Sequence, residues 1–250
     1  MTHAEPALKP LVAAKDLRRT FGRGAAAVEA LAGVSTAFHA AEFTAIVGPS
    51  GSGKSTLMHC LAGLDQPTAG SIVIDGADLA ALSDNALTKV RRDKIGFIFQ
   101  SFNLLPVLSA RENIELPLRL GGADVDAAWI DELIATVGLT DRQTHRPAEL
   151  SGGQQQRVAV ARALASRPTV VFADEPTGNL DSRSSGEVLD LLRRSVDEFG
   201  QTLVMVTHDA RAAARADRIV ALADGKIVHD GPIPTGGADA VLDLMKEIGQ

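Results

Sequence analysis

The chain has 250 residues, of which 45% are hydrophobic and 22% charged, and this composition excludes a disordered or collagen-like protein. Its 25 basic and 31 acidic side chains leave a net charge of −6, which argues against non-specific binding to nucleic acid. Cys60 is the only cysteine, so an intrachain disulfide is impossible and a reducing compartment fits. No apolar stretch approaches the ~20 residues that span a bilayer, and the first residues lack the regions of a signal peptide, so we expect neither feature.

The first third of the chain alternates apolar runs with turns. Strands are predicted where short apolar runs are bounded by turn residues, at 11–14, 18–21, 43–47 and 71–74. Helical spacing begins at Lys54, and Gly63 is expected to end that helix. This part of the chain therefore predicts a strand–loop–helix unit with further strands on either side.

The middle of the chain, from about residue 100 to 167, has a mostly helical pattern that prolines and glycines interrupt. Apolar side chains between Trp129 and Val137 share one face of a helix, and Gly138 is expected to end it. The segment therefore predicts a helical insert within a sheet-based core.

The last third returns to strands. The runs 169–173 and 202–206 are almost continuously apolar, as expected for strands buried on both faces of a parallel sheet. Apolar spacing in 188–196 predicts the helix that connects them, and residues 219–228 predict a hairpin. A short amphipathic helix at about 238–249 is expected to dock on the core. The alternation of strands and helices indicates an α/β fold.

A phosphate-binding loop is the first motif that carries chemistry. Residues 48–55, GPSGSGKS, satisfy the pattern G-x-x-x-x-G-K-[ST] between an expected strand and an expected helix. Glycines let backbone N–H groups turn toward phosphate oxygens, Lys54 supplies charge to the β- and γ-phosphates, and the Ser55 hydroxyl can ligate Mg²⁺. A chance glycine-rich turn is the alternative, and the strand–loop–helix context favours a nucleotide site. The residues expected to bind it are Gly48, Pro49, Ser50, Gly51, Ser52, Gly53, Lys54, Ser55 and Thr56.

Two carboxylates, Asp174 and Glu175, follow the apolar run of the next strand. An aspartate at a strand end can simply cap a helix, but beside a phosphate loop Asp174 is expected to hold the Mg²⁺ shell. Glu175 can then orient or deprotonate the attacking water. Because Pro176 follows, Glu175 is biased away from helical backbone and is expected to stay extended at the strand tip.

A second helix N-terminus is also open to an anion. Ser151 is a good N-cap, and Gly152 and Gly153 leave the N–H groups of the first turn uncovered. An ordinary capped helix is the alternative. One nucleotide does not need two such ends, so either there are two ligands or this end serves a nucleotide held by another copy of the chain.

The segment 150–154, LSGGQ, resembles the signature motif of the ABC ATPase family, and it stands upstream of the two carboxylates as in that family. Three further motifs occur in the family's order: Gln100 resembles its Q-loop glutamine, Asp181 its D-loop aspartate and His208 its switch histidine. The likeness covers roughly residues 11–230. The chain thus resembles the ATP-binding subunit of an ABC transporter.

This resemblance implies a single domain over residues 1–250 with a P-loop NTPase core, a mostly parallel sheet flanked by helices. It also implies an N-terminal antiparallel β subdomain and an inserted helical subdomain. The core is expected at about 1–99 and 168–230, the helical subdomain at about 100–167, and a C-terminal helix at about 238–249.

The resemblance further implies that two copies hold two ATP molecules head to tail, each gripped by Lys54 and Ser55 of one copy and residues 151–153 of the other. The residues implied to be catalytic are Glu175, His208, Gln100 and Lys54, and those implied to hold Mg²⁺ are Ser55, Gln100 and Asp174. The further residues implied to contact ATP are Phe21, Gln100, Ser151, Gly152, Gly153, Gln154, Asp174, Asp181 and His208.

Two of these side chains have ordinary alternatives. A histidine at a strand end is often simply exposed, but in its motif His208 can hold the γ-phosphate and the water in line. Family members stack adenine on an aromatic residue, usually tyrosine; this chain has no tyrosine, and Phe21 stands in the matching region. A lone phenylalanine after two basic residues is more often ordinary packing. His59 shows no metal-ligand spacing and is interpreted as structural or exposed.

The process that ATP hydrolysis drives depends on a partner protein. We expect no membrane span in this chain, so a role in transport requires a separate permease. The apolar stretches 102–106 and 114–118 lie where the family receives its membrane subunit, although packing within the insert explains the same residues equally well. Residues 100–106 together with residues 173–182 resemble ATPases of the lipoprotein-release and macrolide-export type. That likeness implies export or extraction of a peptide, lipoprotein or drug, from a cytoplasmic position on the inner face of the cell membrane.

Two other functions stay open. One is an ATPase that signals through the membrane without moving a substrate. The other is a soluble ABC ATPase that acts on ribosomes or DNA; such proteins usually carry two ATPase modules or long coiled-coil arms. This chain has neither, and its net charge of −6 argues against a nucleic-acid partner.

Overall fold

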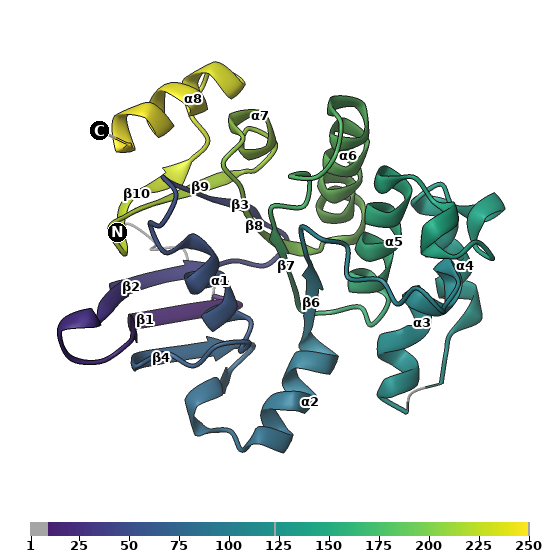
Figure 1. Ribbon diagram of the computed structural model, residues 1–250, viewed down its shortest axis with the longest axis horizontal. Coiled ribbons are helices and arrows are strands. Elements are labelled where there is room, and N and C mark those ends of the chain that lie inside the picture. The colour runs from purple at the N-terminus through teal and green to yellow at the C-terminus, as the bar shows by residue number, and fades with distance from the viewer. Residues whose placement is uncertain (1–9, 123, 250) are drawn as a thin grey trace, which may run out of the picture.

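The structure, a computed structural model that describes residues 10–122 and 124–249, is built on two β-sheets (Figure 1). The smaller sheet has four strands in the order β2-β1-β4-β5, and all of its neighbouring strands are antiparallel. Its strands are β1 (Val12–Phe21), β2 (Val28–Phe38), β4 (Ala69–Ile74) and β5 (Ala77–Asp78).

The larger sheet has six strands in the order β10-β9-β3-β8-β7-β6. Neighbouring strands from β9 to β6 are parallel, and only β10 pairs antiparallel, in the hairpin with β9. The strands are β3 (Phe43–Val47), β6 (Ile95–Ile98), β7 (Val170–Asp174), β8 (Thr202–Val206), β9 (Arg218–Ala223) and β10 (Lys226–Pro232). Because β3, β8 and β7 run parallel in consecutive positions of the sheet, the residues that follow them emerge at one edge of the sheet.

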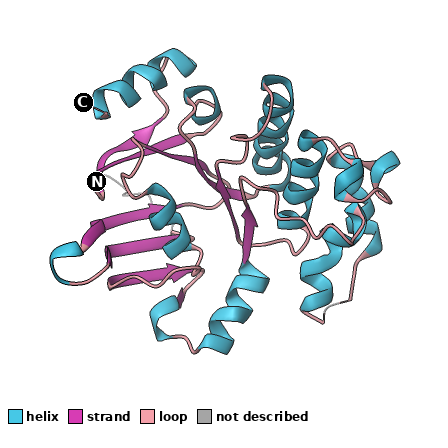
Figure 2. Cartoon of the chain, viewed as in Figure 1, coloured by secondary structure: helices cyan, strands magenta, loops and turns pink. Residues whose placement is uncertain are grey.

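Helices cover the sheets, and three of them, α3, α4 and α5, gather on the side away from the antiparallel sheet (Figures 1 and 2). The helices are α1 (Lys54–Leu61), α2 (Asp84–Lys94), α3 (Ala110–Leu120), α4 (Ala127–Thr136), α5 (Gly152–Leu164), α6 (Ser182–Phe199), α7 (Ala210–Ala213) and α8 (Gly237–Ile248). Short 3₁₀ turns are η1 (Gly24–Ala26), η2 (Leu79–Ala81), η3 (Thr140–Arg142) and η4 (Pro147–Glu149).

The larger sheet is buried on both faces. Along β7, Val171 and Ala173 belong to a hydrophobic cluster with α5 and α6, whereas Val170 and Phe172 belong to a second cluster with α1 and the antiparallel sheet. This alternation follows from the period of two in a strand. It explains why the strand sequences are continuously apolar.

The structure and the sequence agree on the α/β P-loop fold, with two differences of detail. The runs 11–14 and 18–21 are one strand, β1, which is interrupted by a register shift near Asp16, a residue with φ of +50°. The sequence pattern also did not predict β2, α2 or β6. Helix α2 has no fully buried residue and packs on the core through the partly buried Leu87 and Val90, so its apolar stripe is narrow.

The C-terminal helix α8 packs on the core through Val241, which is fully buried, with Leu244, Met245 and Ile248 beside it. Docking, the expected role of this helix, is therefore what the structure shows. Among the residues that the structure describes, no helix is both long and apolar enough to cross a membrane.

Candidate nucleotide site

The phosphate loop connects the end of β3 to the start of α1. Gly48 and Gly53 have positive φ angles of +146° and +100°. A Cβ atom at Gly48 would lie 2.1 Å from the carbonyl oxygen of Leu222, and one at Gly53 would lie 2.3 Å from that of Ala30. Only glycine fits at either position, so the backbone itself forms the wall of this loop.

Lys54 is the buried cation of the loop. Its Nζ donates hydrogen bonds to the carbonyl oxygens of Gly48, at 3.0 Å, and Pro49, at 2.8 Å. Burial lowers the pKa of Lys54, and the carboxylates of Glu175 and Asp174 oppose that shift. An ammonium has three donors, so one is left to reach a phosphate over the loop.

A cavity of about 420 Å³ lies over the loop and brings it together with Glu175 and His208. The two residues come from the ends of different strands, as parallel neighbours require. Ser52 does not line this cavity; its hydroxyl is buried without a hydrogen-bond partner in the part of the chain that the structure describes. The loop residues that line the cavity are Gly48, Ser50, Gly51, Gly53, Lys54, Ser55 and Thr56.

Asp174, the last residue of β7, lies between two side chains of α1. The Ser55 hydroxyl donates to Asp174 Oδ1 at 3.3 Å, and His59 Nε2 lies 3.5 Å from Oδ2. Ser55 and His59 are four residues apart and so share one face of the helix. The sequence pattern gave His59 no role at the site, and this helical spacing from Ser55 is the signal that could have found it.

The Ser55 and Asp174 oxygens fit a Mg²⁺ ion that also takes phosphate oxygens and water. Within residues 10–122 and 124–249, no three His, Cys, Asp or Glu side chains gather as a metal site. The third expected ligand, Gln100, does not line the cavity. Its amide lies against Gly178, where a Cβ atom would come within 2.7 Å of Gln100 Nε2.

Glu175 has a left-handed backbone, with φ of +44°. The expectation of an extended strand tip was therefore wrong: Pro176 disfavours right-handed helical backbone, but the turn after β7 adopts the left-handed region instead. The N–H of Glu175 donates to the carbonyl oxygen of Val206 on β8 at 3.0 Å, and its own carbonyl accepts from Gly178 at 3.0 Å. Strain of this kind concentrates at sites where the structure must aim a side chain.

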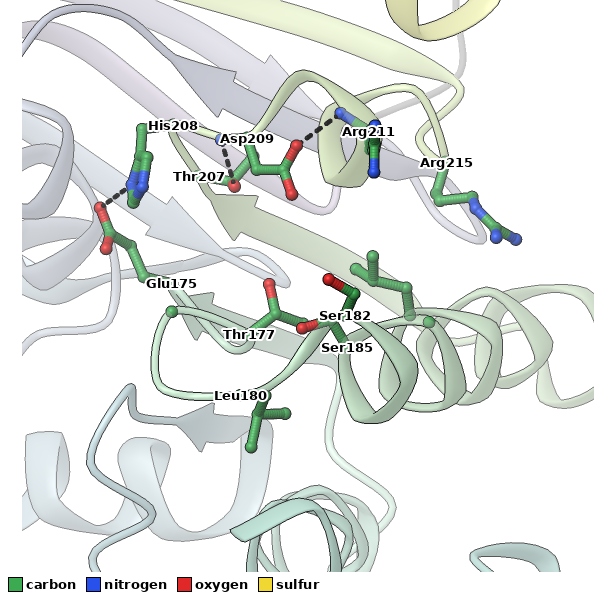
Figure 3. Close-up of a pocket in the computed structure, with 13 residues that line it drawn as sticks. Glu175, Thr177, Leu180, Ser182, Ser185, Thr207, His208, Asp209, Arg211 and Arg215 are labelled. Atoms are coloured by element: carbon green, nitrogen blue, oxygen red, sulfur yellow. Dashed lines mark hydrogen bonds and ion pairs between the residues drawn. The ribbon is translucent and has the colours of Figure 1, made fainter.

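His208 follows β8 and meets Glu175 directly. Its Nδ1 lies 3.0 Å from Glu175 Oε1 (Figure 3). The His208 side chain is 68% exposed and that of Glu175 only 25%. The ring is therefore accessible to a ligand while the carboxylate is partly covered. A second cavity, of about 330 Å³, continues from this pair toward the start of α6 (Figure 3).

The turn Ser151–Gly153 lies at the start of α5 in a reciprocal cap. The Ser151 hydroxyl accepts from the N–H of Gln154 at 3.3 Å, and the Gln154 side chain accepts from the N–H of Ser151 at 2.9 Å. The cap does not involve the N–H groups of Gly152 and Gly153. None of these residues lines the cavity over the phosphate loop, so within one chain the structure does not bring the two motifs together.

Asp181 caps α6. Its carboxylate accepts from the N–H groups of Arg183 and Ser184 and from the Ser184 hydroxyl, at 3.0, 2.9 and 2.8 Å. These hydrogen bonds, those from Ser184 first, lower the pKa of Asp181. Asp181 is therefore fixed next to the turn that leads from Glu175.

Phe21, at the end of β1, is 43% exposed. The guanidinium carbon of Arg19 lies 4.5 Å from its ring centroid, and Arg19 in turn pairs with Asp65 at 2.7 Å. One face of the ring is thus covered by a fixed cation.

Comparison with known proteins identifies the site's family. The family model described as "ABC transporter" matches residues 31–178. The chain is 49% identical over 224 residues to the macrolide export ATP-binding/permease protein MacB of Marinobacter nauticus, covering 89% of this chain and 35% of that protein. It is 48% identical over 238 residues to the lipoprotein-releasing system ATP-binding protein LolD of Anaeromyxobacter dehalogenans, covering 94% and 100%. The chain thus spans about a third of the MacB relatives that it matches and the whole of this LolD.

Solved structures agree. The dimeric post-hydrolysis ATP-binding cassette MJ0796, bound to ADP and Pi, superimposes with a TM-score of 0.81 at 42% identity, covering 89% of this chain and 99% of that one. CbiO1 of Clostridium perfringens, part of an ABC transporter complex, gives a TM-score of 0.78 at 26% identity, covering 89% and 88%. Sequence, fold and site therefore converge, and the chain belongs to the ABC transporter family, as one of its ATP-binding domains.

Proposed function

We propose that the chain binds and hydrolyses ATP as one half of a head-to-tail pair and uses this cycle to drive a membrane permease. The observation that carries the proposal is the contact between Glu175 and His208, 3.0 Å apart on the wall of the cavity over the phosphate loop. A carboxylate base and a histidine beside a phosphate site are what the attack of water on a γ-phosphate requires. The ADP and Pi bound to the similar cassette MJ0796 support the same reaction.

In the proposed reaction Glu175 accepts a proton from the attacking water, and His208 holds the water and the γ-phosphate in line. Lys54 and the N–H groups of the loop balance the charge that builds on the phosphate oxygens. Mg²⁺, held through Ser55 with Asp174 beside it, would neutralise charge on the β- and γ-phosphates. Gln100 would complete the metal shell after its amide turns away from Gly178.

A second copy completes the site in this proposal. The N–H groups of Gly152 and Gly153 stand at the positive end of α5 and suit a γ-phosphate held by the partner's phosphate loop. Because the turn does not line the cavity of its own chain, the proposed contact with the γ-phosphate is made across the pair. Two ATP molecules per pair follow from one set of motifs per chain.

The permease contact is proposed on the segment after Gln100. Leu105 is 44% exposed and Val107 73% exposed, which is unusual for large apolar side chains so close together. The names of the relatives, macrolide export for MacB and lipoprotein release for LolD, support export or extraction as the work performed. This partner would hold the chain at the cytoplasmic face of the membrane.

Two measurements test the proposal. The purified chain is expected to release phosphate from ATP in the presence of Mg²⁺, and light scattering is expected to detect an ATP-dependent dimer. The tagged chain is also expected to co-purify with a permease from membranes. Recovery with ribosomes and without any membrane protein would contradict the transport function.

A further inference from the structure

Arg162 on α5 is a half-buried cation without an acidic partner. Among the described residues, no carboxylate lies within ion-pair distance of its guanidinium, which donates instead to the carbonyl oxygens of Phe102 at 2.9 Å and Asn103 at 2.5 Å. Burial lowers the pKa of Arg162. A half-buried charge that only carbonyls compensate has a desolvation cost, so a simple packing role does not explain why arginine stands here.

The two carbonyls belong to a strained turn. Phe102 and Asn103 both have left-handed backbones, with φ of +54° and +50°, and neither is glycine. Two such residues in succession persist only when their surroundings hold them in place. The planar guanidinium of Arg162 presents two N–H groups at fixed spacing, which suits two successive carbonyls better than a lysine would.

The segment 99–103, which contains this turn, is attached to α5 at two further points. A Cβ atom at Gly152 would lie 3.8 Å from Phe102 Cζ, so the Phe102 ring lies over the first turn of the helix. Gln156, fully buried on α5, donates to the carbonyl oxygen of Phe99 at 3.4 Å and to that of Pro176 at 2.7 Å. The segment 99–103 is therefore held along most of α5, from the Ser151 end to Arg162.

The segment leads directly into the exposed apolar side chains Leu105 and Val107. Asn113 on α3 fixes that part, because its amide accepts from the N–H of Leu105 at 2.8 Å and donates to the carbonyls of Leu105, Leu108 and Ser109. Leu105 thus lies between a fixed point on α3 and the turn that Arg162 holds. A force on this exposed surface has a short path to α5.

We propose that Arg162 is a positioning residue that makes the turn Phe102–Asn103 and the Ser151 end of α5 move as one body. A displacement of the exposed Leu105 and Val107 then moves the Ser151 turn that contacts the nucleotide. In the reverse direction, nucleotide binding at that turn changes the position of Leu105 and Val107. The inference rests on the proposed function of the Ser151 turn.

Hydrogen exchange tests this coupling without needing the permease. In a Glu175→Gln background, ATP with Mg²⁺ is expected to slow amide exchange in residues 151–156 and also, by at least about threefold, in residues 101–108. Arg162→Ala is expected to keep the first response and lose the second. Arg162→Lys, which has no planar fork, is expected to give an intermediate response and serves if the alanine variant does not fold. Arg157→Ala is the matched control, because Arg157 lies on the same helix but donates to Val137, and both responses should persist.

The outcomes separate the two proposals. A full response in residues 101–108 in Arg162→Ala, or in Arg162→Lys where the alanine variant is unfolded, overturns the role of Arg162 and leaves the proposed function standing. Absence of any ATP response in residues 151–156 of the parent overturns the proposed function and this inference with it.

Discussion

The imidazole of His208 lies 3.0 Å from the carboxylate of Glu175, although 33 residues separate them in the chain. The sheet explains this contact. β7 and β8 are parallel neighbours with Asp174 opposite Val206, so the two strands end at the same level of the sheet. The N–H of Glu175 bonds to the Val206 carbonyl and fixes the level further. The proposed base and the proposed phosphate contact are thus placed by strand register.

Replacing Lys54 with alanine is expected to weaken ATP binding by about 10- to 100-fold, since charge-assisted hydrogen bonds to a phosphate contribute about 1.5–3 kcal/mol. Isothermal calorimetry measures the change. Lys89→Ala, on the exposed side of α2, is the control and should bind ATP normally. Unchanged affinity in Lys54→Ala would remove the phosphate-loop assignment.

Two glycine substitutions should have opposite effects on stability. Gly48→Ala is expected to lower the free energy of unfolding by about 2 kcal/mol or more, because its Cβ would lie 2.1 Å from the Leu222 carbonyl oxygen at φ of +146°. Gly186→Ala, inside α6 and in open space, is expected to raise it by about 0.5–1 kcal/mol. Urea denaturation followed by circular dichroism measures both, and a stable Gly48→Ala protein would refute the close turn.

Phe21→Ala is expected to weaken ATP binding by about 2- to 10-fold, the loss of one stacking contact. Phe21→Trp should restore it, because the wider ring still offers a face. Competition with a fluorescent ATP analogue measures the affinities. If Phe21→Ala binds ATP as tightly as the parent, adenine stacks elsewhere.

Cys60 predicts a pH-dependent loss of stability. Burial, helped by Asp65 and opposed by Arg19, raises the pKa of the Cys60 thiol from 9.0 to about 11. The unfolded chain therefore loses this proton first as pH rises from about 9 to 11, and the native state is destabilised over that interval. Between pH 8 and pH 10 the urea midpoint of unfolding should fall further for the parent than for Cys60→Ala. Parallel losses in both proteins would contradict the buried, protonated thiol.

Much of the fold could be predicted because the strands of the larger sheet are buried on both faces. Continuous apolar runs as short as 169–173 and 202–206 are typical of such strands, and β7 and β8 lie there. Helix α2 was not predicted because its apolar stripe is narrow, and β6 was not predicted because it is only four residues long and contains Gly96. Hydrophobic periodicity in the sequence does not reveal helices and strands that are stabilised mainly by tertiary contacts.

The candidate site also has features that the sequence predicted and features that only the structure shows. Motif spacing pointed to Lys54, Glu175 and His208, which the structure gathers around one cavity. It could not reveal the left-handed backbone of Glu175, because only the pairing of β7 with β8 determines that turn. The hydrogen bond from Arg162 to the Phe102 carbonyl also could not be predicted, because it is a tertiary contact between residues that are 60 apart in the chain.

Glu175→Gln tests whether Glu175 is the base of an ATP-driven pair, and Glu132→Gln on the exposed face of α4 is the control. Single-turnover phosphate release and light scattering would be measured on the same samples. We expect Glu175→Gln to hydrolyse ATP about 10²- to 10⁴-fold more slowly, to bind ATP as before and to accumulate as a dimer. Turnover at the parent rate, or a monomer at saturating ATP, would contradict this role of Glu175.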